Sequence, residues 1–414
     1  MTRVKLILLL LVIPATLFAN GGSVYTRYGL GDLIFLNSAR NLGLGSIGFA
    51  AANGNYINSL NPAAWNNIIL TRFELGMYYS GKNLSDNNSS VLYSDVEFSG
   101  FIIGFPVNRE LGISVVGGLI PYSQVGYELN NVISHPLVED DYDLNLVGSG
   151  GVNKFFIGSS YRTPFDIAIG VAFEYYTGKI DYTSLINFPI TSVYRDATYL
   201  NSHKFKGTGL NLGLISNDFS DLLGIDKLKE LRLGLNYNFV MSANADTTLF
   251  ALTSLGTDPI ENGFMDVSIP SRLGIGASFL WDDNYLVMVD YITQQMSGYK
   301  FNDTDYSFMA DLERLSLSLE YKKKDVRYAT FWEQVSLRGG LSYEQSQYRF
   351  NGEQISQLSL HAGVSFPIGL ESSIDLGFEY GIRGTTDNNL IKENIYKVFF
   401  SINFGELWFI RQER

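Results

Sequence analysis

The sequence predicts an all-β fold: a transmembrane antiparallel β-barrel of about 14 strands with an N-terminal hatch inside the lumen. Three observations predict it. Many short segments alternate bulky apolar residues with small or polar ones, their connections alternate between long and short, and the chain begins with an export signal. Each observation has a physical meaning, and together they favour a membrane barrel over a soluble sandwich.

The first residues have the three parts of a secretory signal peptide. Arg3 and Lys5 carry positive charge, residues 6–13 are apolar, and Ala19 ends a stretch of small residues. The alternative is a membrane anchor helix, although the apolar run is short for one. The chain has no cysteine, so neither a lipid-modified cysteine nor a disulfide framework is expected. The expected domains are a signal peptide (1–19), a hatch or plug (20–69) and the transmembrane barrel (70–414).

The strand signal is a period of two residues. In residues 374–382, "IDLGFEYGI", the apolar positions alternate with Asp, Gly and Glu. Successive side chains of an extended chain point to opposite faces, so this segment has one apolar and one polar face. About fourteen such segments recur, each near the 9–11 residues that a tilted strand needs to cross a bilayer. They are 71–79, 98–107, 111–122, 152–162, 165–176, 207–216, 231–240, 271–281, 285–295, 312–322, 335–345, 356–368, 373–382 and 396–404.

The connections carry independent information because their lengths are sorted. Short turns such as "PVNRE", "RTPFD" and "WDDN" alternate with long polar stretches such as 123–151, 177–206 and 241–270, which are expected to be external loops. Outer-membrane barrels have long external loops and short periplasmic turns, whereas a sandwich has no reason to sort its loops. In hydrocarbon every backbone polar group needs a partner, so the strands are expected to close into a ring.

Residues 20–69 lack the strand pattern and are rich in Gly, Asn, Ala and Ser. A ring of about fourteen strands encloses more space than its own side chains fill, so this stretch is expected to be the hatch. Within it, Asn61 is expected to cap a short helix that begins at Pro62, followed by Ala63 and Trp65. The alternative is an exposed, flexible arm.

Composition and motifs exclude several function classes. The net charge is −12, without the basic stripe of a nucleic-acid-binding protein. No phosphate-binding loop, dinucleotide fingerprint or zinc-ligand spacing appears, so no cofactor, no metal site and no enzyme activity are expected. Of the three histidines, His135 and His203 fall in expected external loops, and His361 is expected to point inward beside Ser359 and Ser365. An outer-membrane hydrolase would need His361 within hydrogen-bond reach of a serine.

Several stretches resemble the long-chain fatty-acid outer-membrane transporters of the FadL type and their aromatic-hydrocarbon-uptake relatives, in particular Bacteroidetes-type members. The resemblance covers most of the mature chain in order. It rests on "SVYTRYGLGDL" (23–33), "NPAAW" (61–65), "VSIPSRLGIGASFLWDDNYLVMVDY" (267–291), "SLRGGLSYEQS" (336–346) and "GELWF" (405–409). It implies a fourteen-stranded barrel in the outer membrane of a Gram-negative bacterium, and a hydrophobic ligand path that leaves through a gap at a kinked third strand.

The third strand has residues that suit a kink: Gly117, Gly118 and Pro121. Glycine weakens a strand and proline removes a ladder donor, although a plain bulge would explain them equally. Inward apolar residues are expected either to line the ligand path or to pack against the hatch. They are Val116, Ile120, Phe156, Leu280, Leu286, Met288 and Phe399.

Inward charges of both signs are expected to pair across the lumen or to bind the hatch, although one arginine could instead bind a ligand carboxylate. They are Arg72, Glu74, Lys154, Arg162, Glu174, Arg232, Arg272, Asp290, Glu320, Arg338, Asp375 and Glu379.

The expected function is passive uptake of hydrophobic small molecules, fatty-acid-like or aromatic, across the outer membrane. The expected partners are the lipid bilayer and the hydrophobic ligand, with no nucleic acid. The alternative is a non-transporting barrel that serves as a structural or docking component of a type IX-like protein secretion system, whose proteins would then be its partners.

Overall fold

The computed structural model describes residues 22–134, 140–253, 256–323, 329–369 and 371–407. The signal-peptide prediction and His135 therefore lie outside the described residues. No helix in the described part of the chain is long and apolar enough to span a membrane.

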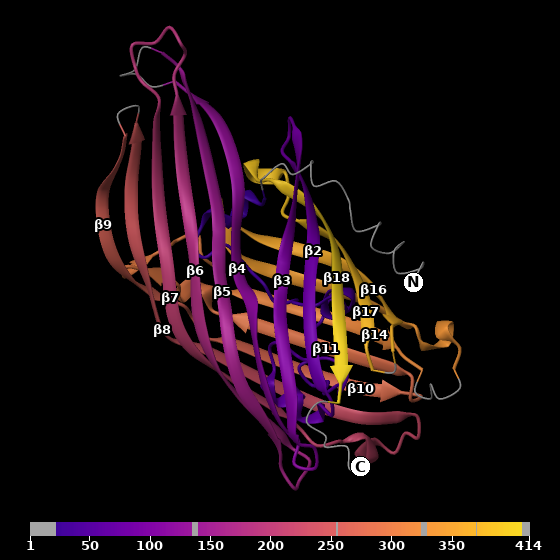
Figure 1. Ribbon diagram of the computed structural model, residues 1–414. Helices are drawn as coiled ribbons and strands as arrows, with labels where there is room; N and C mark the ends of the chain where they lie inside the picture. The colour runs from indigo at the N-terminus through magenta and orange to yellow at the C-terminus, as the bar shows by residue number, and fades with distance from the viewer. Residues whose placement is uncertain (1–21, 135–139, 254–255, 324–328, 370, 408–414) are drawn as a thin grey trace, which may run out of the picture.

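Fourteen antiparallel strands of the described chain form a closed ring (Figure 1), which confirms the predicted fold class. Each strand pairs with the next, and pairing of the last strand, β18, with the first, β2, closes the ring. The ring strands are β2 (Thr71–Ser85), β3 (Ser90–Asn108), β4 (Ile113–Ile133), β5 (Tyr142–Arg162), β6 (Ala168–Asn187), β7 (Ala197–Ile215), β8 (Leu228–Thr253), β10 (Arg272–Trp281), β11 (Tyr285–Gln294), β14 (Leu312–Tyr321), β15 (Ser336–Phe350), β16 (Glu353–Pro367), β17 (Ser373–Arg383) and β18 (Lys392–Glu406).

The remaining elements are short, apart from one long strand outside the ring. The helical elements are η1 (Val24–Arg27), α2 (Ala39–Leu44), η2 (Pro62–Asn67), η3 (Ser220–Leu223), η4 (Met296–Gly298), η5 (Phe331–Gln334) and η6 (Asp387–Asn389). The additional strands are β1 (Asp32–Leu33), β9 (Gly256–Ser268), β12 (Lys300–Phe301) and β13 (Thr304–Asp305). Four of these elements, η1, β1, α2 and η2, precede the ring and lie inside it.

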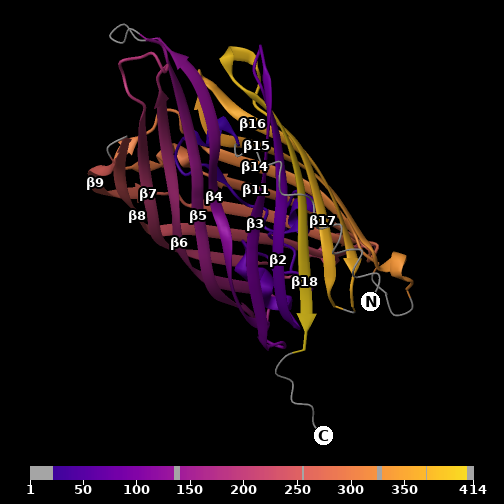
Figure 2. The same ribbon diagram turned by 45° about the horizontal axis from the view of Figure 1, so that its top comes forward.

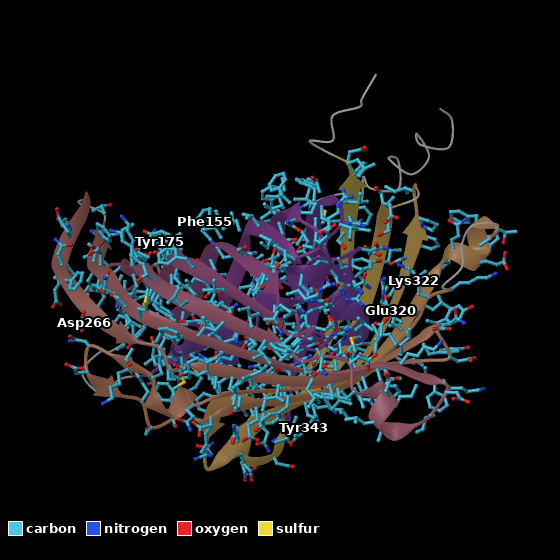
Figure 3. All side chains as sticks on the ribbon, turned by 90° about the horizontal axis from the view of Figure 1, so that it is seen from below. Phe155, Tyr175, Asp266, Glu320, Lys322 and Tyr343 are labelled. Carbon is cyan, nitrogen blue, oxygen red and sulfur yellow. The ribbon has the colours of Figure 1, made fainter. Side chains whose placement is uncertain are left out.

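The outer face of the ring is apolar and the inner face is polar, as the alternation predicts. On β14, Leu315, Leu317 and Leu319 are 52%, 52% and 46% exposed, whereas the intervening Ser316 and Ser318 are buried. Large aromatic side chains point outward around the ring (Figure 3). A soluble protein rarely exposes so continuous an apolar belt, and a hydrocarbon surrounding satisfies it.

The wall of the barrel has unequal height (Figure 2). Strands β10, β11 and β14 have 10 residues each, which suffices to cross a bilayer, but β8 has 26 residues. The prediction of long external loops at 123–151, 177–206 and 241–270 is wrong in this respect, because much of each stretch continues as strand. His203 therefore lies on β7 rather than in a loop. These stretches are polar because the strands extend beyond the apolar belt there, not because the chain stops forming strands.

Candidate functional site in the lumen and the wall

The described residues that precede the ring, 22–70, are called here the N-terminal segment, and they lie inside the barrel (Figure 1). Phe49, Leu42 and Trp65 are almost fully buried, although the sequence around them lacks the alternation of a strand. Glycines on the inner wall permit this close approach. A Cβ at Gly340 would collide with the Leu44 carbonyl group, so only glycine fits there.

The helix α2 is one well-defined part of the N-terminal segment. The Ser38 side chain caps it by accepting a hydrogen bond from the Asn41 backbone nitrogen at 3.2 Å. Gly45 ends it in the left-handed conformation with φ of 66°. The helix packs against the inner face of β14–β18 and so fills one side of the lumen.

A single carboxylate on β11 holds the turn that follows α2. Asp290 accepts hydrogen bonds from the backbone nitrogens of Ile47, Gly48 and Phe49 at 3.0, 2.7 and 3.1 Å. It also accepts one from the Ser46 hydroxyl group. Successive backbone N–H groups directed at one point form an anion-binding concavity, and here the barrel itself supplies the anion.

A second attachment is an ion-pair network. Glu320 on β14 accepts two hydrogen bonds from Arg40 of α2, at 2.6 and 3.3 Å, and one from Arg338 of β15 at 2.7 Å. Arg338 also lies 3.5 Å from Asp375 of β17. These buried charges are compensated by one another, which agrees with the expectation of structural pairing.

Two further ion pairs show the same pattern. Lys154 and Glu174 form a buried pair at 2.8 Å. Asp32 of β1 accepts two hydrogen bonds from Arg383 at 2.8 and 2.9 Å. Burial alone would raise the pKa of Asp32, but the Arg383 guanidinium outweighs it and holds that pKa below its ordinary value.

The last helical element of the N-terminal segment, η2, begins as the sequence predicts. The Asn61 side chain accepts a hydrogen bond from the Ala63 nitrogen at 3.1 Å, and Pro62 is the first residue of η2. The Trp65 indole donates to the Asn58 carbonyl oxygen at 2.7 Å and its ring stacks on Phe156 of β5.

The residues expected to line a ligand path occupy separate places. Val116, Ile120 and Phe156 pack in one buried cluster with Trp65, and Met288 lies beside Gly48. Each of these four side chains therefore contacts or lies next to the N-terminal segment, which occupies the lumen. Their role in a ligand path stays a prediction.

The other three expected path residues line cavities. Phe399 stacks on Tyr78, with ring centroids 5.2 Å apart, beside a chamber in the lumen. Leu280 and Leu286 line a 410 Å³ cavity at the short-turn end of the barrel, next to residues 50–54 of the N-terminal segment. A path that joined all seven positions would require this segment to move.

The wall is interrupted between β3 and β4. These strands pair only from Asn108–Ile113 to Phe101–Leu119, and beyond Leu119 they separate. The pairing of β4 with β5 also shifts in register between Pro121 and Ser123. The interruption therefore begins just after Gly117 and Gly118, at the strand for which the sequence suggests a kink.

The N-terminal segment takes the place of β3 along this part of β4. In β1, Asp32 and Leu33 pair with Gln124 and Ser123. The Ile34 nitrogen donates to the Tyr122 carbonyl oxygen at 2.9 Å. Backbone groups that the missing strand would satisfy are thus partly satisfied from inside.

A 470 Å³ cavity, called here the wall gap, lies between the separated strands. Its lining is mixed, and its polar residues include Lys82, Asp95, Glu97 and Gln124. The Gln124 amide donates to Glu97, so one polar contact bridges the two sides.

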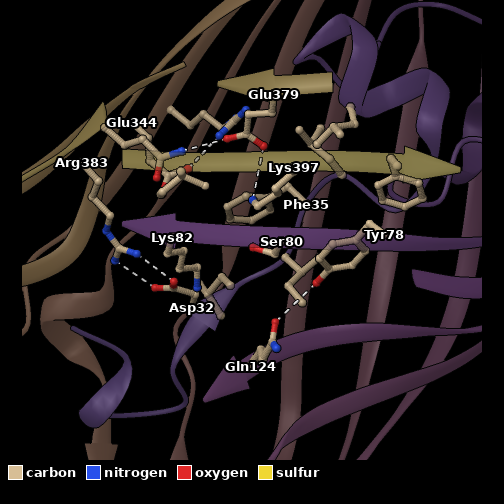
Figure 4. Close-up of a pocket in the computed structure, with 18 of the residues that line it drawn as sticks. Asp32, Phe35, Tyr78, Ser80, Lys82, Gln124, Glu344, Glu379, Arg383 and Lys397 are labelled. Carbon is tan, nitrogen blue, oxygen red and sulfur yellow. Dashed lines mark hydrogen bonds and ion pairs between the residues drawn. The ribbon is translucent and has the colours of Figure 1, made fainter. Parts of the chain in front are cut away.

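A smaller chamber of 100 Å³ lies behind the wall gap in the lumen (Figure 4) and shares Asp32, Ser80, Lys82 and Gln124 with it. Lys397 and Glu379 form an ion pair at 3.3 Å at the edge of this chamber. Its mixed, mostly paired charges suit water better than an apolar molecule.

An apolar groove of 450 Å³ lies on the outer, bilayer-facing wall at the same place. Gly117 and Gly118 form its floor because they have no side chains, and Phe101, Leu119 and Phe155 line it. The groove therefore borders the point at which β3 and β4 separate.

An aromatic cleft of 310 Å³, called here the mouth cleft, lies at the long-loop end of the lumen. Arg27 and His203 add polar groups to it. Sequence reasoning missed this site, although the aromatic residues of 299–308 were a signal. The aromatic lining consists of Tyr28, Tyr127, Tyr182, Phe205, Tyr299, Phe301, Tyr306 and Phe308.

His361 does reach a serine, but a different one from those near it in sequence. Its Nε2 lies 2.9 Å from the Ser342 hydroxyl group. Its Nδ1 has no hydrogen-bond partner among the described residues, so no carboxylate orients the ring there. The ring packs against Gly45 of the N-terminal segment, which covers it. The described residues also contain no group of three or more potential metal ligands.

The closed ring, the apolar belt and the filled lumen define a class: a membrane-spanning β-barrel that holds its own N-terminal segment inside. The BamG family model matches residues 1–413, and the chain belongs to this BamG family. A search of curated proteins found no match.

Solved structures of similar fold include hydrocarbon channels. The toluene transporter TodX of P. putida has a TM-score of 0.60 at 17% identity, with 90% of this chain and 99% of that chain covered. The Ralstonia pickettii toluene transporter TbuX gives 0.57 at 16% identity, covering 89% and 98%. A Pseudomonas aeruginosa FadL homologue gives 0.57 at 10% identity, covering 90% and 98%. At these identities the likeness establishes the shared fold.

Proposed function

We propose that this barrel mediates passive passage of hydrophobic small molecules across the outer membrane of a Gram-negative, Bacteroidetes-type bacterium. The mouth cleft is the observation that carries the proposal. It is concave, lies at the long-loop end of the lumen, and is lined by eight Tyr and Phe residues. TodX and TbuX, which share the fold, are toluene transporters. In this proposal residues 1–19 are the signal peptide that directs export.

The proposed route begins with capture in the mouth cleft. The N-terminal segment then acts as a hatch, because in the filled state it occupies the space between the cleft and the short-turn end. Its polar attachments include those at Asp290, Glu320 and Arg383, and in this proposal they break and reform as the segment moves. Movement of the segment would expose the seven inward apolar residues that it now covers or adjoins.

The proposed exit is at β4, beside Gly117, Gly118 and Pro121. The apolar outer groove leads from this point into the bilayer and supports lateral release. The wall gap just beyond it carries the charged side chains of Lys82, Asp95 and Glu97, which suit hydrocarbon poorly, so the exit is placed at the groove end of the gap. The alternative role as a docking component of a type IX-like secretion system has no specific observation in its favour.

The test measures binding of naphthalene to the purified full-length barrel in detergent by ligand fluorescence. Full burial of one aromatic ring stabilises by about 1.5–3 kcal/mol, so loss of two rings in Phe301→Ala/Phe308→Ala should weaken binding at least about tenfold. The matched control is Tyr343→Ala/Phe378→Ala, which removes two exposed rings that line neither the mouth cleft nor the outer groove. Tyr343 faces outward in Figure 3.

The control should bind naphthalene as the wild type does. Equal affinity of the wild type and the Phe301/Phe308 variant would contradict a role for the mouth cleft. Equal loss in both variants would place the binding on the bilayer-facing surface instead.

A further inference from the structure

The strand β9 lies outside the closed ring and forms a margin of the raised wall. One edge pairs with β8, from Asn244–Asp266 to Thr253–Gly256. The other edge meets β12 only at Val267 and Ser268, and the Asn302 nitrogen donates to the Asp266 carbonyl oxygen. For residues 256–265 no backbone partner lies on that edge in the part of the chain that the structure describes. Figures 1 and 2 both show β9 at the margin of the sheet.

The upper part of this edge carries the protective features of natural edge strands. Pro259 has no backbone N–H, and the ladder with β8 is irregular between Leu249 and Phe250. The lower part, Asn262–Asp266, has a regular ladder with β8 and contains no proline. Within it only the Asp266 carbonyl group is already engaged on this edge by a described residue, through the Asn302 nitrogen, so a window of about four residues, Asn262–Met265, is open to a further strand.

The side chains around this window have a definite chemistry. Phe264 and Ile260 are 63% and 56% exposed. Asp258, Glu261 and Asp266 are also exposed and give the edge a negative charge. A second copy of the chain would bring like charges together in an edge-to-edge pair, which is unfavourable. A partner strand with basic residues and an apolar contact for Phe264 would be complementary.

We propose that the free edge of β9 at Asn262–Met265 binds an extended, basic segment of another polypeptide by β-strand addition. Main-chain hydrogen bonds to the edge supply the register, and the three carboxylates select for positive charge. This surface is separate from the mouth cleft and the lumen, so it is independent of the proposed passage of small molecules.

The experiment uses the full-length protein in detergent and three synthetic peptides. The first is the basic peptide Lys-Thr-Val-Lys-Val-Thr-Lys. The second is its analogue with Glu in place of Lys, and the third is the basic peptide with backbone N-methylation at alternate residues. Affinity is measured by titration, and amide hydrogen exchange is followed across residues 256–268. Alternate amides of Asn262–Met265, which point away from β8, should become protected only with the unmodified basic peptide.

Two charge-reversal variants distinguish binding at the β9 edge from a general effect of the protein's net charge. Asp258→Lys/Glu261→Lys/Asp266→Lys should weaken binding of the basic peptide about tenfold, because three weak attractions between exposed charges become repulsions. The control changes three exposed acidic residues at the short-turn end, Glu110→Lys/Asp221→Lys/Asp226→Lys, by the same charge. The control should bind as the wild type does.

The proposal is overturned if the basic peptide does not bind, or if it binds without protection of Asn262–Met265. Equal binding of the N-methylated peptide would also overturn it, because the edge hydrogen bonds would then be dispensable. Protection of β9 that rises with protein concentration in the absence of peptide would identify a second copy as the occupant and reject the basic partner.

Discussion

Replacement of Asp290 by alanine should release the part of the N-terminal segment that follows α2. The substitution removes the acceptor for the backbone nitrogens of Ile47, Gly48 and Phe49. Each of these groups is buried, and a buried donor left unpaired costs about 1–3 kcal/mol. Water can enter beside the cavities, so each group should cost an amount near the lower end of that range. For the three groups together, the segment should lose about 3–4 kcal/mol of stability in its closed position.

The assay exploits the absence of cysteine from the chain. Ala50, which follows the three nitrogens directly and is almost fully buried, is changed to cysteine in each background. A maleimide then labels this cysteine only when the segment opens, so the rate reports the opening equilibrium. The expected loss corresponds to labelling that is about a hundred- to a thousandfold faster in the Asp290→Ala background.

Two controls bracket this result. Asp290→Asn keeps an acceptor oxygen but loses the charge, so its labelling should be accelerated less than that of Asp290→Ala. Asp246→Ala removes a solvent-exposed carboxylate on β8 and should leave the rate unchanged. Labelling of the Asp290→Ala protein at the wild-type rate would refute the reasoning, because the segment would then be held without this carboxylate.

Two other predictions concern the contacts of the segment and of the wall gap. Gly340→Ala should also speed labelling at Ala50, by an overpacking penalty of about 1–3 kcal/mol, because its Cβ would collide with the segment at Leu44. Gly339→Ala, whose Cβ finds ordinary space, should not, and equal effects of the two would count against steric displacement. Cysteines at Glu97 and Gln124, joined by a short bifunctional maleimide, should tie β3 to β4 and slow release of naphthalene, whereas either single cysteine should not. Unchanged release after cross-linking would argue against an exit at this place.

The architecture of the ring could be predicted because its signal is local and repeated. Each strand must turn bulky residues to hydrocarbon and small or polar ones inward, so alternation such as that around Leu317 is visible in a single segment. The start of η2 was predictable for a similar reason, since the Asn61–Pro62 pair acts on its own neighbours.

The lengths of the strands beyond the apolar belt could not be predicted in the same way. Where β6 and β7 rise above the apolar belt, the outer face carries exposed polar residues such as Lys179 and Lys204, whereas Ile180 and Phe205 pack inside. The pattern of bulky residues outside and polar residues inside, which identifies the membrane strands, is therefore lost there. His203 illustrates this, because its surroundings in sequence are polar although it pairs in a ladder with Thr247. The strand prediction therefore fails where the surroundings of the strand change from hydrocarbon to water although its backbone conformation does not.

The site was the least predictable part because it is assembled from distant segments. The mouth cleft brings together Tyr28, Tyr182 and Phe308, and more than a hundred residues of sequence separate each of them from the next. The role of Asp290 was open for a related reason. The two-residue period of the strand predicts that the Asp290 side chain points inward. The three nitrogens that it binds belong to the N-terminal segment, whose sequence has no such period.

The most direct test of the account is passage through the barrel with the N-terminal segment fixed in place. In the variant Ala39→Cys/Ser401→Cys, two neighbouring positions, where the Ala39 nitrogen donates to the Ser401 hydroxyl group at 3.3 Å, are joined by oxidation. Naphthalene flux through this protein in liposomes should stop on oxidation and return on reduction, whereas each single variant should conduct in both conditions. Equal flux through the oxidised and reduced double variant would contradict the claim that the segment must move.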